Sequence, residues 1–276
     1  MKRFAAVLST LCCALAITLT ASAQDLTTFS TLEGTINIAG GTAHIQVMKT
    51  CAKNIMRTNP RIRITIAGGG SGIGAQKVGE GLVDIGNTGR ALSDKEKSKY
   101  NLVSYPFAID GVSTVLHKDN PVSTLTSQQI RDIFAGRITN WKAVGGQDAP
   151  INLYVRDEAS GTRAVYWKKL LNKEQVLDKA NVVPSNGAMK TAISKDLNGI
   201  GYVSIGHLDK SVKAPLLDGV IPDQDNARNG SYKVVRKLYM NTQPNPSLLV
   251  KAFIDYVYSP SGSAIIAANG FIPTGR

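Results

Sequence analysis

The sequence predicts an α/β fold with a largely parallel sheet, and three observations support this class. From Thr35 onward, short runs in which apolar and polar residues alternate are followed by longer runs with apolar residues at helical spacing. The strand-like runs repeatedly end in glycine and hydroxyl residues, which suit a turn that opens a helix. Polar residues or proline then end the helical runs before the next apolar run begins.

The first half of the chain reads as a β-α-β-α-β series. Its elements are a strand at 36–38, a helix at 44–56, a strand at 62–66, a helix at 73–82 and a strand at 83–86. Asn59-Pro60 stops the first helix, and a glycine-rich turn at 68–72 precedes the second.

A second unit begins near residue 116. Its predicted elements are a helix at 127–134, strands at 151–155 and 201–203, a polar loop at 223–230, a strand at 234–240, a helix at 248–258 and an extended end at 270–273. Ser259-Pro260 is expected to end the helix at 248–258. No repeat or low-complexity tract interrupts this order.

The N-terminus has the pattern of a secretory signal peptide. Lys2 and Arg3 precede an apolar run at 4–19, and Ala21-Ser22-Ala23 matches a small-x-small cleavage site. We therefore expect residues 1–23 to be removed and the mature protein to be periplasmic or secreted. A transmembrane anchor is the alternative, but the run is short for one. Cleavage removes two cysteines and leaves Cys51, which we expect to be a buried core residue.

The basic composition argues for a small anionic ligand more than for nucleic acid. The chain has 32 Lys and Arg against 20 Asp and Glu, a formal charge of +12. These residues are scattered and are not interleaved with aromatic side chains for base stacking. A positive field that attracts anions and a merely soluble basic surface both fit this pattern.

Residues 156–162, Arg-Asp-Glu-Ala-Ser-Gly-Thr, are the most informative segment. An apolar, helix-like run follows, so Ser160-Gly161-Thr162 stands at a helix N-terminus with hydroxyls, free N–H groups and the positive end of the dipole. Arg156 can bring a planar fork of donors to the same point. The segment therefore predicts a site for a small oxyanion, phosphate or sulfate best of all.

The same construction occurs at Thr42 and Ser71, where a strand ends and a helix opens. Each hydroxyl could be an ordinary helix cap, which is worth about 1 kcal/mol. If the three turns converge with Arg156, they could surround a tetrahedral anion with donors and exclude water.

Other residues gave weaker signals. Arg90 follows a strand end, where ligand-facing loops lie, but could equally begin a charged surface helix. Asp110 lies in an apolar run and must be paired, either with an arginine or with the proton of hydrogen phosphate. Gly70-x-Gly72-x-x-Ala75 is only a relaxed dinucleotide fingerprint, and no phosphate loop ending in Gly-Lys-Ser/Thr is present.

The three histidines, His44, His117 and His207, show no metal-ligand spacing, and His44 is expected on a helix surface. No Ser-His-Asp order emerges either. The sequence therefore predicts no metal, no cofactor and no catalytic residues.

These motifs resemble the periplasmic phosphate-binding proteins that supply the ABC-type phosphate importer. The resemblance spans nearly the whole mature chain and is carried by Gly40-Gly41-Thr42-Ala43, Gly70-Ser71-Gly72, Val83-Asp84-Ile85-Gly86-Asn87, Ala108-Ile109-Asp110-Gly111-Val112, Ile130-x-x-Ile133-Phe134-x-Gly136-x-Ile138-Thr139-Asn140-Trp141, Arg156-x-x-x-Ser160-Gly161-Thr162, Gly199-Ile200-Gly201-Tyr202 and Gly270-Phe271-Ile272-Pro273.

The resemblance implies a two-lobed, type II-like periplasmic-binding-protein fold with the anion in the interlobe cleft. Residues 34–112 plus 234–276 would form lobe one, and residues 116–233 would form lobe two. The expected ligand-binding residues are Thr42, Ala43, Ser71, Gly72, Gly89, Arg90, Asp110, Arg156, Ser160, Gly161 and Thr162.

Two departures from the family pattern affect selectivity. Gly41 and Ala43 stand where hydroxyl residues are frequent in the family, and Gly89 stands where some members have an aspartate that accepts a phosphate proton. Without that acceptor, discrimination against sulfate is in question unless Asp110 or Asp157 provides it.

The predicted function is capture of inorganic phosphate by a monomeric, non-enzymatic binding protein that delivers it to the membrane subunits of an ABC importer. Three alternatives stay open: a binding protein for sulfate, molybdate or a phosphonate, a secreted enzyme acting on phosphate esters, and an adhesive or signalling role on the same scaffold.

Overall fold

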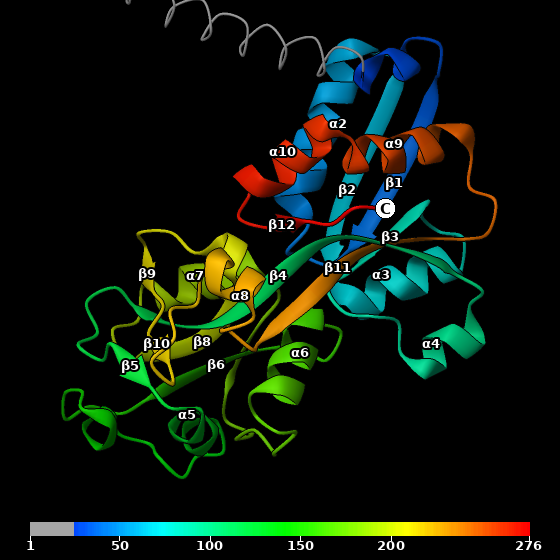
Figure 1. Ribbon diagram of the computed structural model, residues 1–276. Helices are drawn as coiled ribbons and strands as arrows, with labels where there is room; N and C mark the ends of the chain where they lie inside the picture. Colours follow the sequence, from blue (N-terminus) through cyan, green and yellow to red (C-terminus); the bar gives the residue numbers. More distant parts are fainter. Residues whose placement is uncertain (1–24) are drawn as a thin grey trace, which may run out of the picture.

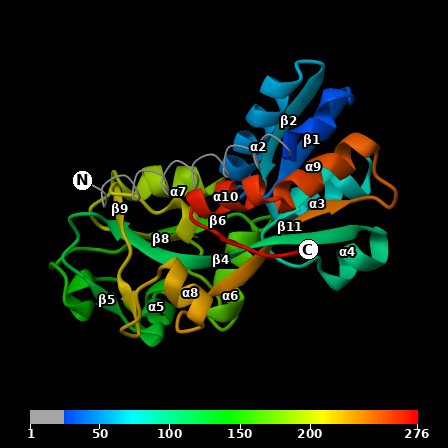
Figure 2. The ribbon, with the colours of Figure 1, turned by 45° about the horizontal axis from the view of Figure 1, so that its top comes forward.

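The computed structural model describes residues 25–276, which form two lobes of strands and helices, one above the other in Figure 1. The predicted signal peptide, residues 1–23, lies outside the described residues. Two long strands, β4 (Val103–His117) and β11 (Val235–Thr242), run between the lobes (Figures 1 and 2). In the described part of the chain, no helix has the length and apolarity needed to span a membrane.

One continuous mixed sheet connects the lobes, with the order β2-β1-β3-β11-β4-β8-β6-β7. In the upper lobe β1 (Gly34–Gly40) pairs in parallel with β2 (Ile62–Gly69) and β3 (Ile85–Thr88). In the lower lobe β6 (Asn152–Arg156) pairs in parallel with β7 (Asn181–Val183) and β8 (Gly199–Ser204). The predicted parallel pairing is therefore correct within each lobe, whereas β11 and β4 cross between them as antiparallel strands.

Helices cover both faces of the upper sheet. Ile36, Ile38 and Ile85 face a core shared with α2 (Ile45–Thr58) and α9 (Leu248–Tyr258), and α10 (Pro260–Ala268) packs on these two helices. Cys51 is buried in this core, as predicted. On the opposite face Gly86 lies against α3 (Gly70–Gly79).

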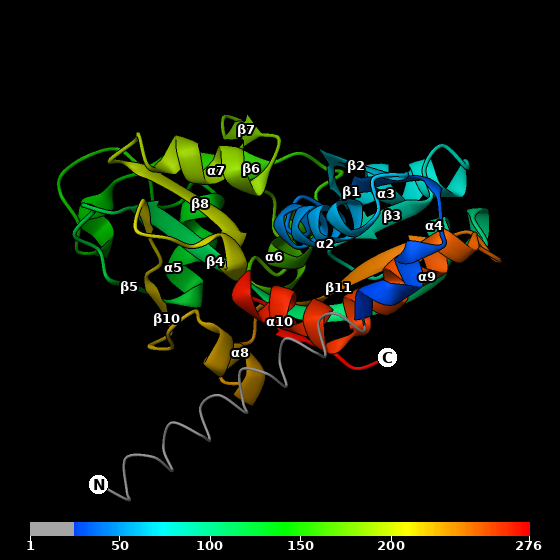
Figure 3. The same ribbon diagram turned by 90° about the horizontal axis from the view of Figure 1, so that it is seen from above.

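The lower lobe has a similar layered arrangement. One core lies between the sheet and the helices α5 (Ser127–Phe134) and α6 (Gly161–Lys169). A second, smaller core joins Val203 to Met189 and Ile193 of α7 (Asn186–Ile193). Because Tyr202 and Val203 belong to different cores, α5 and α7 lie on opposite faces of this sheet (Figure 3).

The remaining elements are short. They are the 3-10 turns η1 (Thr27–Ser30), η2 (Trp141–Val144) and η3 (Ile205–His207), the helices α4 (Asp94–Lys99) and α8 (Gln224–Asn229), and the strands β5 (Thr124–Leu125), β9 (Val212–Lys213), β10 (Leu216–Leu217) and β12 (Ile272–Pro273).

The sequence prediction omitted two helices for the same reason. The polar segment 223–230 contains α8, which Asp223 caps and Gly230 ends in a left-handed conformation. The helix predicted at 248–258 ends at Tyr258 as expected, but a further helix, α10, begins directly after it, with Ser259 as its cap and Pro260 in its first turn. In both cases a residue type common in turns serves instead as a helix-start signal.

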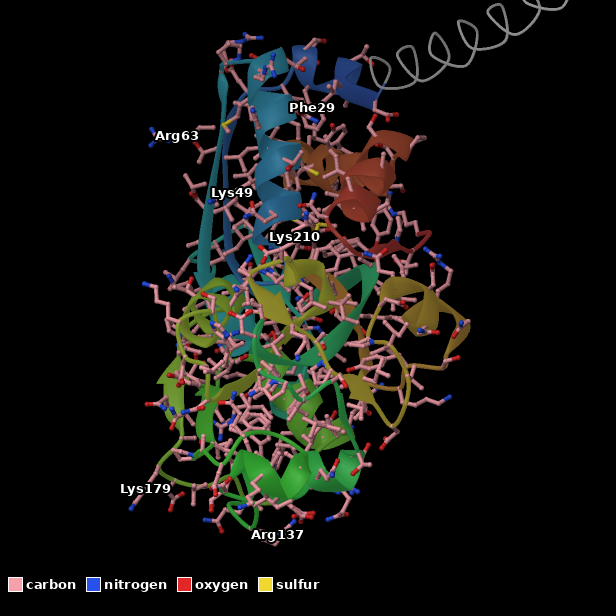
Figure 4. All side chains as sticks on the ribbon, turned by 90° about the vertical axis from the view of Figure 1, so that its left-hand side faces the viewer. Phe29, Lys49, Arg63, Arg137, Lys179 and Lys210 are labelled. Carbon is pink, nitrogen blue, oxygen red and sulfur yellow. The ribbon has the colours of Figure 1, made fainter. Side chains whose placement is uncertain are left out.

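The basic side chains are distributed over both lobes, in agreement with their scattered positions in the sequence. Lys49 and Arg63 are exposed on the upper lobe, and Arg137 and Lys179 are exposed at the lower end of the other (Figure 4). The positive charge of the protein is thus not concentrated in one tract.

The start of α3 lies so close to β1 and β3 that it admits only glycine. A Cβ on Gly74 would lie 3.0 Å from Gly40 Cα and 3.1 Å from the Ala39 carbonyl oxygen, and it would collide with the Asn87 carbonyl oxygen. This close approach holds the N-terminus of α3, with Ser71, beside the ends of both strands.

We expect Gly74→Ala to lower the free energy of unfolding by about 1–3 kcal/mol, because the methyl group overpacks this contact. Gly187→Ala in α7 is the matched control, since a Cβ there meets only Ser185 Oγ at 3.8 Å. That variant should gain stability slightly through helix propensity. Urea unfolding of both variants measures the difference, and equal effects would contradict the packing argument.

Candidate functional site

A small cavity lies where the two lobes meet. It is lined by Gly41, Thr42, Ala43, His44, Gly70, Ser71, Gly89, Arg156, Ser160, Gly161, Thr162 and Arg236. The residues come from the ends of β1, β3 and β6, from the starts of α3 and α6, and from β11. The three hydroxyl-bearing turns singled out in the sequence therefore line one cavity together with Arg156.

Ser160 begins α6 as an N-cap residue. Its backbone is extended, at φ −71° and ψ 117°, and its hydroxyl accepts a hydrogen bond from the Arg163 N–H at 3.2 Å. Ala164 makes the first bond of the helical ladder, to the Ser160 carbonyl. The N–H groups of Gly161 and Thr162 precede that bond, so they lack a helical acceptor and can serve an anion. Gly161 must be glycine because a Cβ would collide with Ser71 Oγ from the other lobe.

All four cavity hydroxyls already accept a hydrogen bond from the protein. Besides Ser160, Thr42 Oγ1 accepts from Asn186 Nδ2 at 3.1 Å and Ser71 Oγ accepts from the Gly89 N–H at 2.8 Å. Thr162 Oγ1 accepts from Arg236 Nη1 at 3.0 Å. Within residues 25–276 none of these hydroxyls donates a hydrogen bond, so their four protons are available to a ligand that accepts.

Arg156 provides further donors at the end of β6. Its side chain is 1% exposed, and backbone carbonyls fix it in place, Val183 accepting from Nε at 3.0 Å and Pro184 from Nη2 at 2.8 Å. Nη1 has no hydrogen-bond partner among the described residues. Burial lowers the pKa of this guanidinium and the nearby charge of Asp157 opposes the shift only in part, so a bound anion would offset the remaining desolvation cost.

Arg236 was not recognised in the sequence as a site residue. Its Nε donates to Asp110 Oδ2 at 2.8 Å, and Ser204 Oγ donates to Asp110 Oδ1 at 2.9 Å. Nη2 lies 2.7 Å from the same Oδ2 but has no hydrogen bond of acceptable geometry. Burial raises the pKa of the Asp110 carboxyl, and the charge of Arg236 opposes this shift. Arg156 and Arg236 both line the cavity, whereas Asp157 and Asp110, the carboxylates beside them, do not.

His44 is buried, and the expectation that it lies on a helix surface is wrong. Its ring packs on Phe107, with centroids 5.4 Å apart, and Nε2 lies 3.0 Å from the Thr88 carbonyl oxygen. Burial, together with the charge of Arg236, lowers the pKa of His44 to about 3. The ring is therefore neutral at neutral pH.

Of the predicted site residues, eight line the cavity and three do not. The eight are Thr42, Ala43, Ser71, Gly89, Arg156, Ser160, Gly161 and Thr162. The Gly72 N–H donates to the Ala159 carbonyl of the other lobe, and Arg90 forms two hydrogen bonds to Glu96, at 2.6 and 2.8 Å. Asp110 is committed to Arg236 and Ser204. These three residues thus already have protein partners.

Four lining residues were missed: Gly41, His44, Gly70 and Arg236. The two glycines belong to turns that had been identified, so their positions were available. Arg236 gave no signal, because an arginine in a strand with alternating residues resembles a solvent-facing one. Across the described residues, no three His, Cys, Asp or Glu side chains come close enough together to hold a metal ion.

The chain is similar to known proteins over most of its length. Residues 23–261 match the family described as the PBP superfamily domain. The phosphate-binding protein PstS of Bacillus subtilis is 32% identical over 87% of this chain and 81% of its own length. PstS of Pseudomonas aeruginosa is 30% identical over 88% of this chain and 84% of its own.

Two solved structures have the same arrangement of the chain. A putative phosphate ABC transporter substrate-binding protein from Clostridium perfringens, with bound phosphate, has a TM-score of 0.84 and 34% identity over 87% of this chain and 100% of that one. An ABC-type phosphate transport receptor from Vibrio cholerae has a TM-score of 0.70 and 32% identity over 86% and 99%.

The buried histidines make the stability of the fold sensitive to acid. His44 has a pKa of about 3, and burial beside Lys190 lowers the pKa of His207 to about 4. Between these values and the ordinary value near 6.5 the unfolded chain binds protons that the folded chain does not, so stability falls as the pH falls.

We expect the free energy of unfolding to be lower at pH 5 than at pH 7 by about 2 kcal/mol for each of these histidines. His44→Gln removes one titration, so its stability should change less over the same interval. Urea unfolding at the two pH values measures both chains. Parallel curves for the two proteins would contradict the assignment.

Proposed function

We infer that this chain, which belongs to the PBP superfamily and within it to the family of the phosphate-binding protein PstS, captures inorganic phosphate outside the cytoplasm for an ABC importer. The main support for this proposal is the cavity between the lobes, where four hydroxyl protons and the Arg156 Nη1 group have no acceptor in the described protein. Such a cavity needs an anion with several acceptor oxygens.

Phosphate fits the donors better than a carboxylate does. Its tetrahedral oxygens can meet donors from several directions, and here they converge from both lobes and from the N-terminus of α6. The guanidinium groups of Arg156 and Arg236 line the cavity and no carboxylate does, so the lining complements an anion.

The interlobe contacts support a mechanism of capture by closure. Thr42 of the upper lobe accepts from the Asn186 N–H and side chain of the lower lobe, and the Gly72 N–H donates to the Ala159 carbonyl. The side chain of Arg156, which belongs to the lower lobe, is buried when the lobes are in contact. Movement about β4 and β11 would open the cavity, and an anion bound between the lobes would favour the closed arrangement through its contacts with both.

The remaining parts of the proposal concern location and partners. The signal-peptide pattern of residues 1–23 supports export to the periplasm or exterior. We propose that the protein is a monomer and that it delivers phosphate to the membrane subunits of the importer. The relatives are named as binding proteins, and we propose binding without turnover, which an assay with a generic phosphate ester tests.

A second candidate ligand is another oxyanion, sulfate above all. None of the residues that line the cavity is an aspartate or glutamate, so no cavity carboxylate disfavours a fully ionised anion. Titration of the protein with phosphate, sulfate and molybdate distinguishes the candidates.

Arg156→Ala should raise the Kd for phosphate about a hundredfold or more, because truncating one member of a buried charge pair costs about 2–5 kcal/mol. Arg90→Ala is the control: it also removes a guanidinium, but one that pairs with Glu96 outside the cavity. Calorimetric titration of both variants should show a large loss for the first and little change for the second. Unchanged affinity in Arg156→Ala would overturn the site.

A further inference from the structure

The hydroxyl and arginine groups of the cavity are hydrogen-bond donors, and donors alone do not make the site select phosphate over sulfate. At neutral pH hydrogen phosphate carries one proton, whereas sulfate carries none. Discrimination requires a lone pair that accepts the phosphate proton and that opposes an unprotonated oxygen at the same point. If the protein captures phosphate, as proposed above, one of its atoms must supply that lone pair.

The hydroxyl groups are poorly suited to this role. Each of the four uses a lone pair to accept from the protein and has its proton left to donate. The two arginines carry donors only. A hydroxyl that met the phosphate proton would still need another acceptor for its own proton.

His44 has the required lone pair. Backbone groups of Thr88, Gly41 and Tyr239 all interact with the ring. The Thr88 carbonyl oxygen lies 3.0 Å from Nε2 and can only accept, so we assign the proton of the neutral ring to Nε2. Nδ1 is then an acceptor without a proton. It is buried and has no hydrogen-bond partner within residues 25–276, although such an atom normally has one.

The His44 ring packs directly against the cavity residue Gly41. A Cβ at position 41 would lie 2.6 Å from both Nδ1 and Cε1 of His44, and both residues line the cavity. The imidazole thus occupies the volume that a side chain at position 41 would need. The missing hydroxyl residue in this loop and the buried histidine are two aspects of one arrangement.

The two nearby carboxylates are less suitable acceptors, because neither of them lines the cavity. Asp110 accepts from Arg236 and Ser204 and does not line the cavity. Asp157 does not line it either, although its Oδ1 is buried without a partner in the described chain and its Oδ2 lies 4.0 Å from Arg156 Nη2. Asp157 is therefore the rival that an experiment must separate from His44.

We propose that His44 Nδ1 accepts the proton of bound hydrogen phosphate and is the group that discriminates phosphate from sulfate. The imidazole would thus take the role of the proton-accepting aspartate that some family members have at the position of Gly89. Unlike a carboxylate, it does so without adding a negative charge to the cavity.

His44→Gln tests the proposal, because a glutamine amide can still donate to the Thr88 carbonyl but has no atom equivalent to Nδ1. Calorimetric titration with phosphate and with sulfate is carried out on the wild type and the variant. We expect the Kd for phosphate to rise about 10- to 100-fold, as for a lost hydrogen bond to a charged group, while the Kd for sulfate stays the same or falls.

The controls separate three outcomes. If wild-type protein binds no phosphate, the proposed function itself fails. If the wild type binds phosphate but His44→Gln weakens phosphate and sulfate by the same factor, the histidine is only structural and this proposal is overturned. If Asp157→Asn rather than His44→Gln removes the preference for phosphate, the acceptor is Asp157 and the proposal is again overturned.

A spectroscopic measurement on the unmodified protein covers the case in which His44→Gln does not fold. The chain has three histidines, so the imidazole nitrogens labelled with nitrogen-15 can be assigned. We expect the His44 Nδ1 signal of an unprotonated nitrogen to move toward the hydrogen-bonded range with phosphate and not with sulfate. An Nδ1 that carries a proton before phosphate is added, or that does not respond to it, would contradict the proposal.

Discussion

The ion pair of Asp110 and Arg236 is the interaction on which the rest of the site depends. The two residues face each other on the crossover strands β4 and β11, and the pair leaves Arg236 Nη1 to hold Thr162 at 3.0 Å and the Gly89 carbonyl at 3.3 Å. It thus connects the strands between the lobes to the start of α6 and to the end of β3. A buried pair of this kind adds little net stability, because desolvation offsets the attraction. Its value here is geometric, since it fixes which donors meet in the cavity.

Much of the fold could be predicted because it depends on local signals. Alternation of apolar residues identified β1 and β2, and the serine before α6 identified a helix start with a free first turn. The same local reasoning overlooked two helices, α8 in the segment 223–230 and α10 after Ser259, because turn-forming residues begin both. Which meaning applies depends on what the following apolar residues can pack against, and this is a tertiary property.

The site was predicted only in part, for a related reason. Ser160, Gly161 and Arg156 are close in sequence, so one motif reveals them together. Arg236 owes its role to Asp110, which is 126 positions away, and to a strand pairing that no local pattern encodes. His44 belongs to a loop that was recognised, but its ring turns inward because Gly41 leaves room for it. Short-range spacing predicts which turns can bind an anion, and long-range pairing decides which side chains complete the cavity.

The contact between Gly161 and Ser71 has a consequence for exit from the cavity. These residues belong to different lobes, and the space between them does not admit even a methyl group. The lobes therefore leave no lateral channel between these two residues, and separating the lobes would also break the bonds of Thr42 and Gly72 to the opposite lobe. A partner that separates the lobes would thus act on the cavity without touching its lining.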